Sequence, residues 1–425
     1  MDKARRILWI INHYAQTPRD TGGIRHFALA KHIQKQSNWK CYIVSSSVNH
    51  YTREQLIKKG KSFDSFEYDD VSFLRLRCMR YKSNGIARFI NMLQFAYRAT
   101  VLSSRHLPKP DCVIGSTVHP FAALAGYTLA RRSKAAFIYE IRDFWPKTLE
   151  DLGVLGKKNP LYKIFLFIES LLSKKSDHII SPLPYAHEYL EKEYGVCEGN
   201  LTWVPNGVDF RELGVSSDAG CEWYGTSEQS RNFRFYYFGT QGKASDIDVL
   251  LDAMKIIIAR SEGSYKKISL TIIGDGQENA RLRKRVCDEN IYNVMFIAPV
   301  ARSEIEHICE NADAFIFNPG SLDVFRYGIS SNKLSDFMAA GKPIVFRCAA
   351  RNNPVEEAGC GISLCDLSAA GLANAIEMMS SFDQKILYDM GKAARLYAKQ
   401  NYDYGKISAK MIFALERAVR SRERR

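Results

Sequence analysis

Runs of strand-forming and helix-forming residues alternate along the whole chain, and this alternation is what most narrows the possible folds. In the first half, an apolar run at 7–11 precedes helical spacing over 24–36, and further apolar runs follow at 41–46, 111–116 and 135–143. Continuous apolar runs are typical of parallel strands that are buried on both faces. Strands that alternate with helices predict a doubly wound parallel sheet with helices on both sides.

The second half repeats this alternation. Apolar runs at 233–240 and 268–276 end in glycine turns, and more strand-like runs follow. The segment Val204-Pro205-Asn206-Gly207 separates the two halves. The sequence therefore predicts two similar α/β domains, over residues 1–205 and 206–405.

The positive charge of the chain is concentrated in its first half. The formal net charge is +14, and residues 1–205 hold 31 Lys and Arg against 18 Asp and Glu. This surplus predicts a negatively charged partner, which could be nucleic acid, an anionic membrane or a phosphorylated substrate. The sequence has no pattern typical of common nucleic-acid-binding modules.

Composition excludes several other classes of protein. A hydrophobic fraction of 46% excludes a disordered chain. No stretch reaches the ~18 apolar residues of a membrane-spanning helix, and the N-terminal apolar run is too short for a signal peptide. The ten cysteines are scattered singly, without zinc or redox spacing. We therefore expect a cytoplasmic protein with free thiols and no metal site.

The strongest functional signal is the segment FRYGISSNKLSDFMAAGKPIV at 325–345. Its Gly-Ile-Ser-Ser loop leads into a helix that is expected to begin near Asn332. Backbone N–H groups at a helix start attract phosphate, and Lys333 adds a positive charge in the first turn. An anionic ligand would explain this arrangement, and the alternative is a capped helix with a solvated lysine. Asp336 is either an acceptor for sugar hydroxyls or a surface acid.

Two glycine-rich turns follow predicted strands of the second half. The turn Gly239-Thr240-Gln241-Gly242-Lys243 would let the backbone approach a diphosphate, with Lys243 as counter-charge. Its spacing is not that of a P-loop. The turn Gly274-Asp275-Gly276 either flanks a base or is only a tight connection from strand to helix.

Polar residues and glycines also follow the predicted strands of the first half. Gly22 and Gly23 precede a helix and would let the backbone approach a ligand. His119 directly follows a strand and is either structural or close to a ligand. Arg142 and Asp143 end another strand, as an ion pair that fixes a loop or as a substrate clamp.

Two basic stretches at 85–109 and 157–175 mix Arg and Lys with apolar residues at helical spacing. Such segments lie on an anionic membrane surface in some proteins. The alternative is a pair of core helices whose lysines are solvated.

Together these motifs resemble the retaining glycosyltransferases of family 4, which have the GT-B fold. The resemblance covers nearly the whole chain and is closest to bacterial enzymes that build lipopolysaccharide O-antigen, capsule or another exopolysaccharide. It rests on the motifs Gly22-Gly23, His119-Pro120, Arg142-Asp143-Phe144-Trp145-Pro146, Val204-Pro205-Asn206-Gly207-Val208-Asp209, Gly239 to Lys243, Gly274-Asp275-Gly276 and Asn332 to Pro343.

The resemblance implies two Rossmann-like parallel-sheet domains that face a central cleft. It also implies a final helix at 406–425 that crosses back to the first domain, and a nucleotide sugar held mainly by the second. The implied catalytic residues are His119, Asp143, Lys243 and Lys333. The implied donor-binding residues are Gly22, Gly23, Arg142, Asn206, Gly239, Gln241, Gly242, Gly274, Gly276, Gly328, Ile329, Ser330, Ser331, Asn332 and Asp336.

The sequence departs from the family pattern at one position. Family members commonly carry two acids separated by seven residues, and Asp336 matches the second of them. Gly328 occupies the position of the first. We expect backbone groups of Gly328 and Ile329 to take over part of the role of the missing acid.

The implied reaction moves a hexosyl or N-acetylaminosugar residue, with retention, from a nucleotide sugar to a saccharide acceptor linked to a lipid diphosphate. No metal or other cofactor is expected, and the protein would lie peripherally on the inner face of the bacterial inner membrane. Two other readings stay open: a sugar-nucleotide 2-epimerase of the same fold, and a non-catalytic nucleotide-sugar-binding partner, which Gly328 keeps possible. A nucleic-acid-binding protein is suggested by charge alone.

Overall fold

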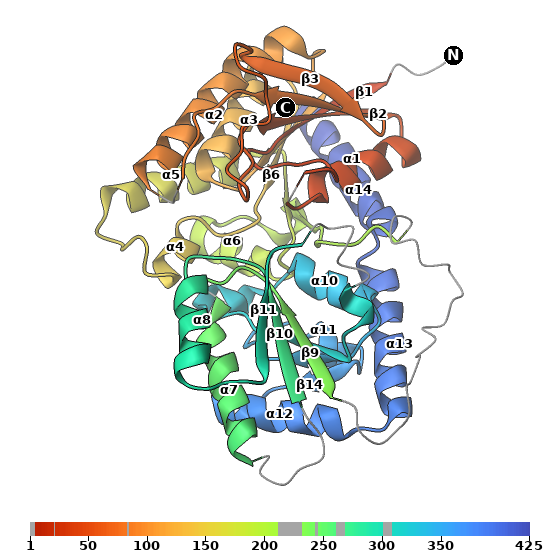
Figure 1. Cartoon of the computed structure of the whole chain (residues 1–425). Coiled ribbons are helices and arrows are strands. Elements are labelled where there is room, and N and C mark those ends of the chain that lie inside the picture. The colour runs from red at the N-terminus through yellow and green to blue at the C-terminus, as the bar shows by residue number, and fades with distance from the viewer. Residues whose placement is uncertain are drawn as a thin grey trace. The chain divides into compact units, whose positions relative to one another are not determined.

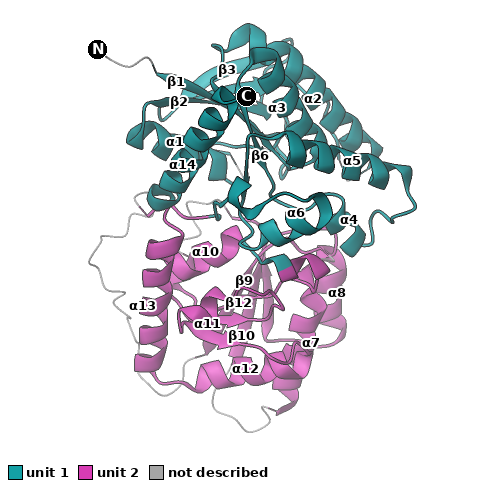
Figure 2. Cartoon of the chain, turned by 180° about the vertical axis from the view of Figure 1, so that it is seen from behind, with its two compact units in different colours: residues 1–206, 327–330, 404–425 teal, residues 207–326, 331–403 magenta. Residues whose placement is uncertain are grey.

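The computed structural model describes residues 5–20, 22–82, 85–210, 232–242, 245–260, 268–300 and 308–425. They form two α/β units, coloured separately in Figure 2. Unit 1 consists of residues 1–206, 327–330 and 404–425, and unit 2 consists of residues 207–326 and 331–403.

Unit 1 contains an eight-stranded sheet in the order β3-β4-β2-β1-β5-β6-β7-β8 (Figure 1). Neighbouring strands are parallel except for the antiparallel pair β3 and β4. The strands are β1 (Arg6–Ile11), β2 (Trp39–Ser46), β3 (Phe63–Tyr68), β4 (Val71–Leu76), β5 (Cys112–Ser116), β6 (Ala136–Glu140), β7 (His178–Ser181) and β8 (Leu201–Trp203).

Helices cover both faces of this sheet because its strand residues alternate between two apolar layers. Leu8 and Ile10 share one core with α1 and α14, whereas α3 packs on β1, β5 and β6 and contacts both α2 and α5. The helices of unit 1 are α1 (Arg25–Gln36), α2 (Ile86–His106), α3 (Pro120–Ser133), α4 (Lys147–Asp151), α5 (Pro160–Lys175), α6 (Ala186–Tyr194) and α14 (Tyr404–Glu423).

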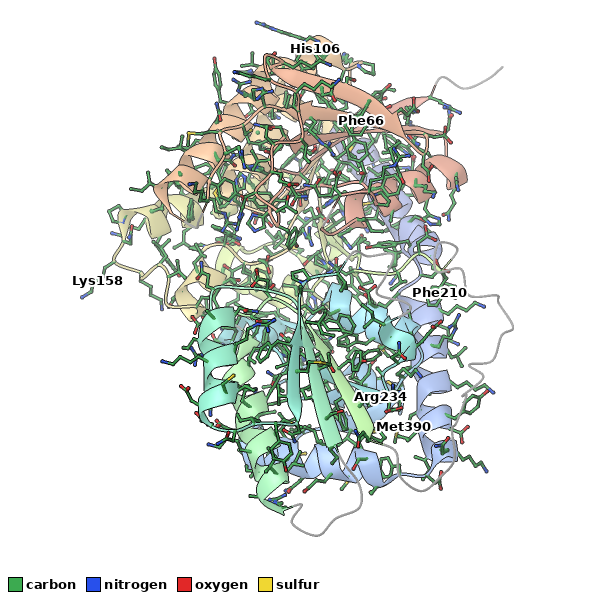
Figure 3. All side chains as sticks on the ribbon, viewed as in Figure 1. Phe66, His106, Lys158, Phe210, Arg234 and Met390 are labelled. Atoms are coloured by element: carbon green, nitrogen blue, oxygen red, sulfur yellow. The ribbon has the colours of Figure 1, made fainter. Side chains whose placement is uncertain are left out.

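Unit 2 contains a six-stranded, fully parallel sheet in the order β11-β10-β9-β12-β13-β14. Its strands are β9 (Phe233–Phe238), β10 (Ile268–Ile273), β11 (Val294–Ile297), β12 (Ala314–Phe317), β13 (Ile344–Phe346) and β14 (Gly361–Ser363). The helices described around it are α7 (Ile247–Arg260), α8 (Asn279–Asp288), α10 (Asn332–Ala339), α11 (Pro354–Glu357), α12 (Ala369–Ser381) and α13 (Gln384–Asn401). Apolar side chains of β9, β10, α7 and α12 form its core, and Figure 3 shows both units filled with side chains.

The predicted pair of parallel-sheet α/β domains is confirmed. The domain boundaries in the structure differ from the expected ones, because Asn206 groups with unit 1 and the final helix begins at Tyr404 rather than at residue 406. The segment Tyr327–Ser330 was expected in the second domain but groups with unit 1. Its contacts are with residues far away in the sequence, so no local pattern could reveal this grouping.

No helix in the described part of the chain is both long enough and apolar enough to cross a membrane.

Candidate functional site

The two glycine turns of unit 2 follow the adjacent strands β9 and β10 and are joined by backbone hydrogen bonds. Gly239 N donates to Ile273 O at 2.9 Å, and Gln241 N donates to Asp275 O at 2.9 Å. Gly274 has a φ of +135°, and a Cβ atom there would overlap the carbonyl group of Gly239. Glycine is therefore required at this close approach of two backbones.

Gln241 is completely buried and holds the two turns together. Its side-chain Nε2 donates to Gly274 O at 2.9 Å, and its Oε1 accepts a hydrogen bond from Asn279 Nδ2. A Cβ atom at Gly276 would overlap the carbonyl of Gln241, so this glycine also serves the packing of the turns. Both polar atoms of the Gln241 amide therefore form hydrogen bonds within the protein, and these bonds stabilise the turn.

Lys333 in the first turn of α10 brings a positive charge to the same turns. Its Nζ lies against Gly239, where any Cβ atom would collide with it, and 5.6 Å from the centre of the Tyr237 ring. Burial lowers the pKa of Lys333 to about 8. Among the described residues, no carboxylate forms an ion pair with this ammonium group.

The start of α10 has no hydrogen bond from a capping side chain of the described residues. The first N–H groups of a helix lack partners within the helix and carry a partial positive charge. Asn332 and Lys333 provide two of these groups, and Asp336 lies one turn further on, half-buried. The arrangement differs from the alternative of a capped helix with a solvated lysine, and it suits an anion.

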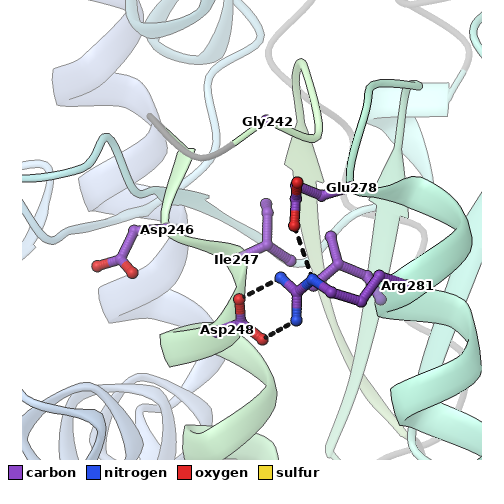
Figure 4. Close-up of a pocket in the computed structure, with 7 residues that line it drawn as sticks. Gly242, Asp246, Ile247, Asp248, Glu278 and Arg281 are labelled. Atoms are coloured by element: carbon purple, nitrogen blue, oxygen red, sulfur yellow. Dashed lines mark hydrogen bonds and ion pairs between the residues drawn. The ribbon is translucent and has the colours of Figure 1, made fainter. Parts of the chain in front are cut away.

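A cavity of about 250 Å³ lies beside the first glycine turn (Figure 4). Arg281 crosses it and donates to both carboxylate oxygens of Asp248, at 3.0 and 2.5 Å, and to Glu278 at 2.6 Å. The carboxylates are thus already paired with a cation. The lining residues are Gly242, Asp246, Ile247, Asp248, Glu278, Arg281 and Leu282.

In unit 1, His119 is fully buried and both of its ring nitrogens are engaged. Its Nδ1 accepts from Ala122 N at 3.2 Å and so caps α3, and its Nε2 lies 2.6 Å from His13 Nδ1. Because Nδ1 accepts, the proton lies on Nε2 and is donated to His13. Burial lowers the pKa of His119 to about 3 and that of His13 well below its ordinary value, so both rings are neutral.

The other predicted residues of unit 1 lie at the ends of its strands. Arg142 N donates to Thr117 Oγ1 at 2.9 Å, Asp143 is exposed, and no ion pair joins these two described residues. Gly22 has a φ of +140°, and a Cβ atom there would come within 2.9 Å of the ring of Tyr51, which is 59% exposed.

Asn206 and Ser330 lie together in unit 1. Asn206 N donates to Ser330 Oγ at 3.0 Å, and Asn206 Nδ2 donates to Ser330 O at 2.7 Å. The preceding Gly328 is buried with a φ of +95°, which favours glycine over the acid that the family commonly has there.

Comparison with known families shows what kind of protein has this architecture. Residues 29–212 match the family model described as Glycosyltransferase Family 4, and residues 232–381 match the one described as Glycosyl transferases group 1. The chain is a glycosyltransferase of these two families. No curated protein sequence matches it.

Solved structures agree on the fold of this glycosyltransferase. Sucrose-phosphate synthase from Thermosynechococcus elongatus is 15% identical with a TM-score of 0.69, and the match covers 96% of this chain and 98% of that chain. HepE from Anabaena, solved with UDP, is 13% identical with a TM-score of 0.64 over 97% and 99% of the chains. WaaG, a glycosyltransferase involved in lipopolysaccharide biosynthesis, is 14% identical with a TM-score of 0.63 over 96% and 99%. The predicted GT-B fold is confirmed.

The predicted site residues of the glycosyltransferase fall into two sets, and Lys243 lies outside the described residues. Unit 1 holds Gly22, Gly23, His119, Arg142, Asp143, Asn206, Gly328, Ile329 and Ser330. Unit 2 holds Gly239, Gln241, Gly242, Gly274, Gly276, Ser331, Asn332, Lys333 and Asp336.

Sequence reasoning missed the buried ion pair between Arg25 and Glu140. Arg25 Nε donates to Glu140 Oε1 at 3.0 Å, and His26 Nε2 lies 2.6 Å from Glu140 Oε2. The charged residue types at the start of α1 and the end of β6 were a signal, but their pairing across 115 positions was not visible in the sequence.

Proposed function

We propose that this glycosyltransferase transfers a hexosyl or N-acetylaminosugar residue from a nucleotide sugar, and that the start of α10 binds the diphosphate of this donor. The observation that carries the proposal is Lys333. Its ammonium group is largely buried, has no carboxylate partner among the described residues and stands at an uncapped helix start. HepE, which has the same fold, was solved with UDP and with UDP-glucose.

The proposed chemistry requires stabilisation of the leaving group. As the bond between the anomeric carbon and the diphosphate oxygen breaks, the sugar gains oxocarbenium character and the nucleoside diphosphate gains negative charge. Preorganised N–H groups and cations are effective at such a position because they need no reorganisation during the reaction. We assign this task to the first turn of α10 with Lys333, and to Lys243. Metal independence belongs to the same proposal and predicts that a chelator leaves the rate unchanged.

We further propose that the transfer proceeds with retention. The acceptor hydroxyl would attack the face from which the diphosphate leaves, and the leaving phosphate would take the proton of this hydroxyl. Such a reaction requires no nucleophile from the enzyme. It is consistent with the buried, neutral His119, whose two ring nitrogens are already occupied.

The proposed acceptor is a saccharide linked to a lipid diphosphate, as in bacterial surface-polysaccharide synthesis. Unit 1 supports this through an apolar stripe on α2 that faces solvent at helical spacing, formed by Ile86, Ile90, Leu93 and Tyr97. Helix α5, which like α2 packs on α3, exposes Ile164 and 68% of Phe167. The other face of each helix is buried in unit 1.

Lysines accompany the exposed apolar residues of α5. Lys157 and Lys158 precede the helix, Lys174 and Lys175 end it, and all four are exposed. Figure 3 shows Lys158 pointing away from the protein. Apolar side chains with basic neighbours suit an anionic lipid surface. We therefore propose that this face of unit 1 contacts the membrane that carries the acceptor.

The decisive experiment replaces Lys333 with methionine, which keeps the length and apolar stem but removes the charge. Donor turnover should fall by about 10²–10³-fold, since one electrostatic donor to the leaving group is lost. Lys385→Met on the exposed surface of α13 is the matched control and should turn over normally. A folded Lys333→Met variant with normal turnover would refute the proposed donor site.

A second candidate is a non-catalytic partner that binds a nucleotide sugar. Gly328 favours it, because the family's first acid is missing there. Such a protein would bind the donor and neither hydrolyse nor transfer it with any acceptor. A 2-epimerase would instead change the sugar of the nucleotide sugar in the absence of an acceptor.

A further inference from the structure

We propose that Arg25 is a positioning residue of the glycosyltransferase, which acts through Asn206 to hold Ser330 and so sets the backbone at the start of α10. The inference rests on the proposed donor site, because Ser330 directly precedes the N-cap residue Ser331 of that helix. It assigns Arg25 and Asn206 a role in the reaction without contact to the donor.

The guanidinium group of Arg25 is 1% exposed and is surrounded by acceptors. Besides Glu140, it donates through Nη2 to Val204 O at 2.7 Å and through Nη1 to Pro205 O. Nη1 also lies 3.4 Å from Asn206 Oδ1. An arginine keeps its charge when buried, and its planar fork fixes the direction of every acceptor around it.

The side-chain amide of Asn206 links Arg25 to Ser330. With its Oδ1 toward Arg25, its Nδ2 donates to Ser330 O at 2.7 Å, while its backbone N–H donates to Ser330 Oγ. All polar atoms of the side chain are therefore used within unit 1. An Asn amide is nearly symmetric in shape, so the cation beside its oxygen determines which end faces Ser330.

Holding the Ser330 carbonyl has a consequence for the next residue. In a planar trans peptide, the C=O of one residue and the N–H of the next point in opposite directions. The hydrogen bond from Asn206 to Ser330 O therefore turns the Ser331 N–H away from Asn206. This N–H is the first of the series that continues into the uncapped first turn of α10.

The other end of the same segment has its own anchor. Tyr327 O accepts from Tyr185 N at 3.2 Å, and the Tyr327 ring lies 5.3 Å from Phe144 and 5.4 Å from Tyr189. Loss of the Ser330 contact leaves this aromatic anchor in place. The expected result is a local change at the start of α10, with the fold retained.

Asn206→Asp tests the proposal most sharply. The new carboxylate keeps an oxygen toward Arg25, but it replaces the donor to Ser330 O with a second oxygen that repels the carbonyl. Nucleoside diphosphate affinity and donor kcat/KM should fall at least about tenfold. This factor corresponds to the loss of one hydrogen bond from the backbone at the start of α10 to the charged diphosphate. The KM for the acceptor and the unfolding temperature should change little. Asn200→Asp, at an exposed position of unit 1, is the matched control.

The probes are UDP, GDP, ADP and inorganic pyrophosphate, and the variants are compared with whichever binds the wild-type protein most tightly. Ser330→Ala removes only the hydroxyl that accepts from Asn206 N and should show a smaller loss in the same direction. If Asn206→Asp does not fold, the donor affinity of Ser330→Ala tests the positioning role in its place. Arg25→Lys keeps a positive charge near Glu140 but loses the fork, and it should lower donor affinity as well.

The outcomes separate the two proposals. If Lys333→Met weakens donor binding while folded Asn206→Asp and Ser330→Ala bind like wild type, the positioning role is wrong and the donor site stands. If Lys333→Met also binds normally, or if no probe binds the wild-type protein, the donor site itself is wrong. An equal loss of acceptor and donor affinity in Asn206→Asp would indicate general disruption and would overturn the positioning role.

Discussion

At the scale of single residues, the site combines Lys333, which has no carboxylate partner among the described residues, with several residues whose polar atoms are already hydrogen-bonded. Lys333 was identified from its motif, because a lysine in the first turn of a helix stands against the helix dipole and calls for an anion. The contacts of Gln241, Asn206 and His119 were not visible in the sequence. Their partners lie up to 181 positions away, so only the fold shows that their polar atoms are already used.

The lowered pKa of Lys333 predicts how donor binding depends on pH. Only the ammonium form attracts the diphosphate, and burial brings its pKa to about 8 in the free protein. Nucleoside diphosphate affinity should therefore fall as the pH rises from 7 to 9.5, with a midpoint at or above 8 because bound anion favours the ammonium form. Calorimetric titrations at several pH values measure this. Lys333→Met should bind weakly with a flat profile over this range, and an equally steep profile would assign the dependence to another group.

At the scale of elements, the strongly periodic helices and the fully buried strands could be predicted, and the weakly patterned ones could not. Strands β3 and β4 form an antiparallel hairpin at the edge of the unit 1 sheet, where β3 alternates polar and apolar residues and resembles a loop. Strand β14 has only three residues. Helix α5 was recognised as apolar and basic, but its buried acid was not given a role.

Glu169 of α5 joins this helix to α6. Its Oε2 accepts from the hydroxyl groups of Tyr189, at 2.8 Å, and of Tyr194, and its Oε1 has no hydrogen-bond partner among the described residues. Burial raises the pKa of Glu169 to about 8. The folded protein thus keeps a proton there over a pH range in which the unfolded chain, with an ordinary pKa near 4.5, has lost it.

This raised pKa predicts that the contribution of Glu169 to stability is present below pH 4.5 and is lost as the pH rises through about 8. Glu169→Gln stays neutral and keeps an oxygen for the two tyrosines, so it should flatten the fall of the unfolding temperature between pH 5 and 8.5. The exposed Glu191→Gln on α6 is the matched control. The interpretation fails if Glu169→Gln and wild type lose stability in parallel over this range.

At the scale of the whole molecule, the asymmetric charge distribution gains a physical meaning through the exposed face of α2 and α5. Charge counting predicted an anionic partner, but it could not distinguish a membrane from a nucleic acid. The exposed apolar stripe beside the lysines favours a lipid surface.

The domain boundaries could be predicted to within two residues at each end of unit 2, whereas the return of Tyr327–Ser330 to unit 1 depends on aromatic and amide contacts that have no sequence signature.

Neutralising this face should weaken membrane binding without affecting donor chemistry. Each lysine near an anionic surface contributes about 1 kcal/mol. Replacing Lys157, Lys158, Lys174 and Lys175 with glutamine should therefore lower binding to phosphatidylserine-containing vesicles by at least about tenfold. Donor hydrolysis in solution should persist. The matched control replaces four exposed lysines of unit 2, Lys284, Lys385, Lys392 and Lys399. Equal vesicle binding by both variants would show that the lysines around α5 have no special role in membrane binding.

The return of the chain to unit 1 at Tyr404 has a consequence for the order in which the protein is completed. Helix α14 contributes Ile407, Met411 and Leu415 to the core that contains Leu8 and Phe27. Because a ribosome makes these residues after unit 2, one apolar face of the unit 1 sheet stays uncovered until α14 has been synthesised. Unit 2, which consists of residues 207–326 and 331–403, is synthesised in full before that helix. In folding terms, unit 2 is an insertion within unit 1.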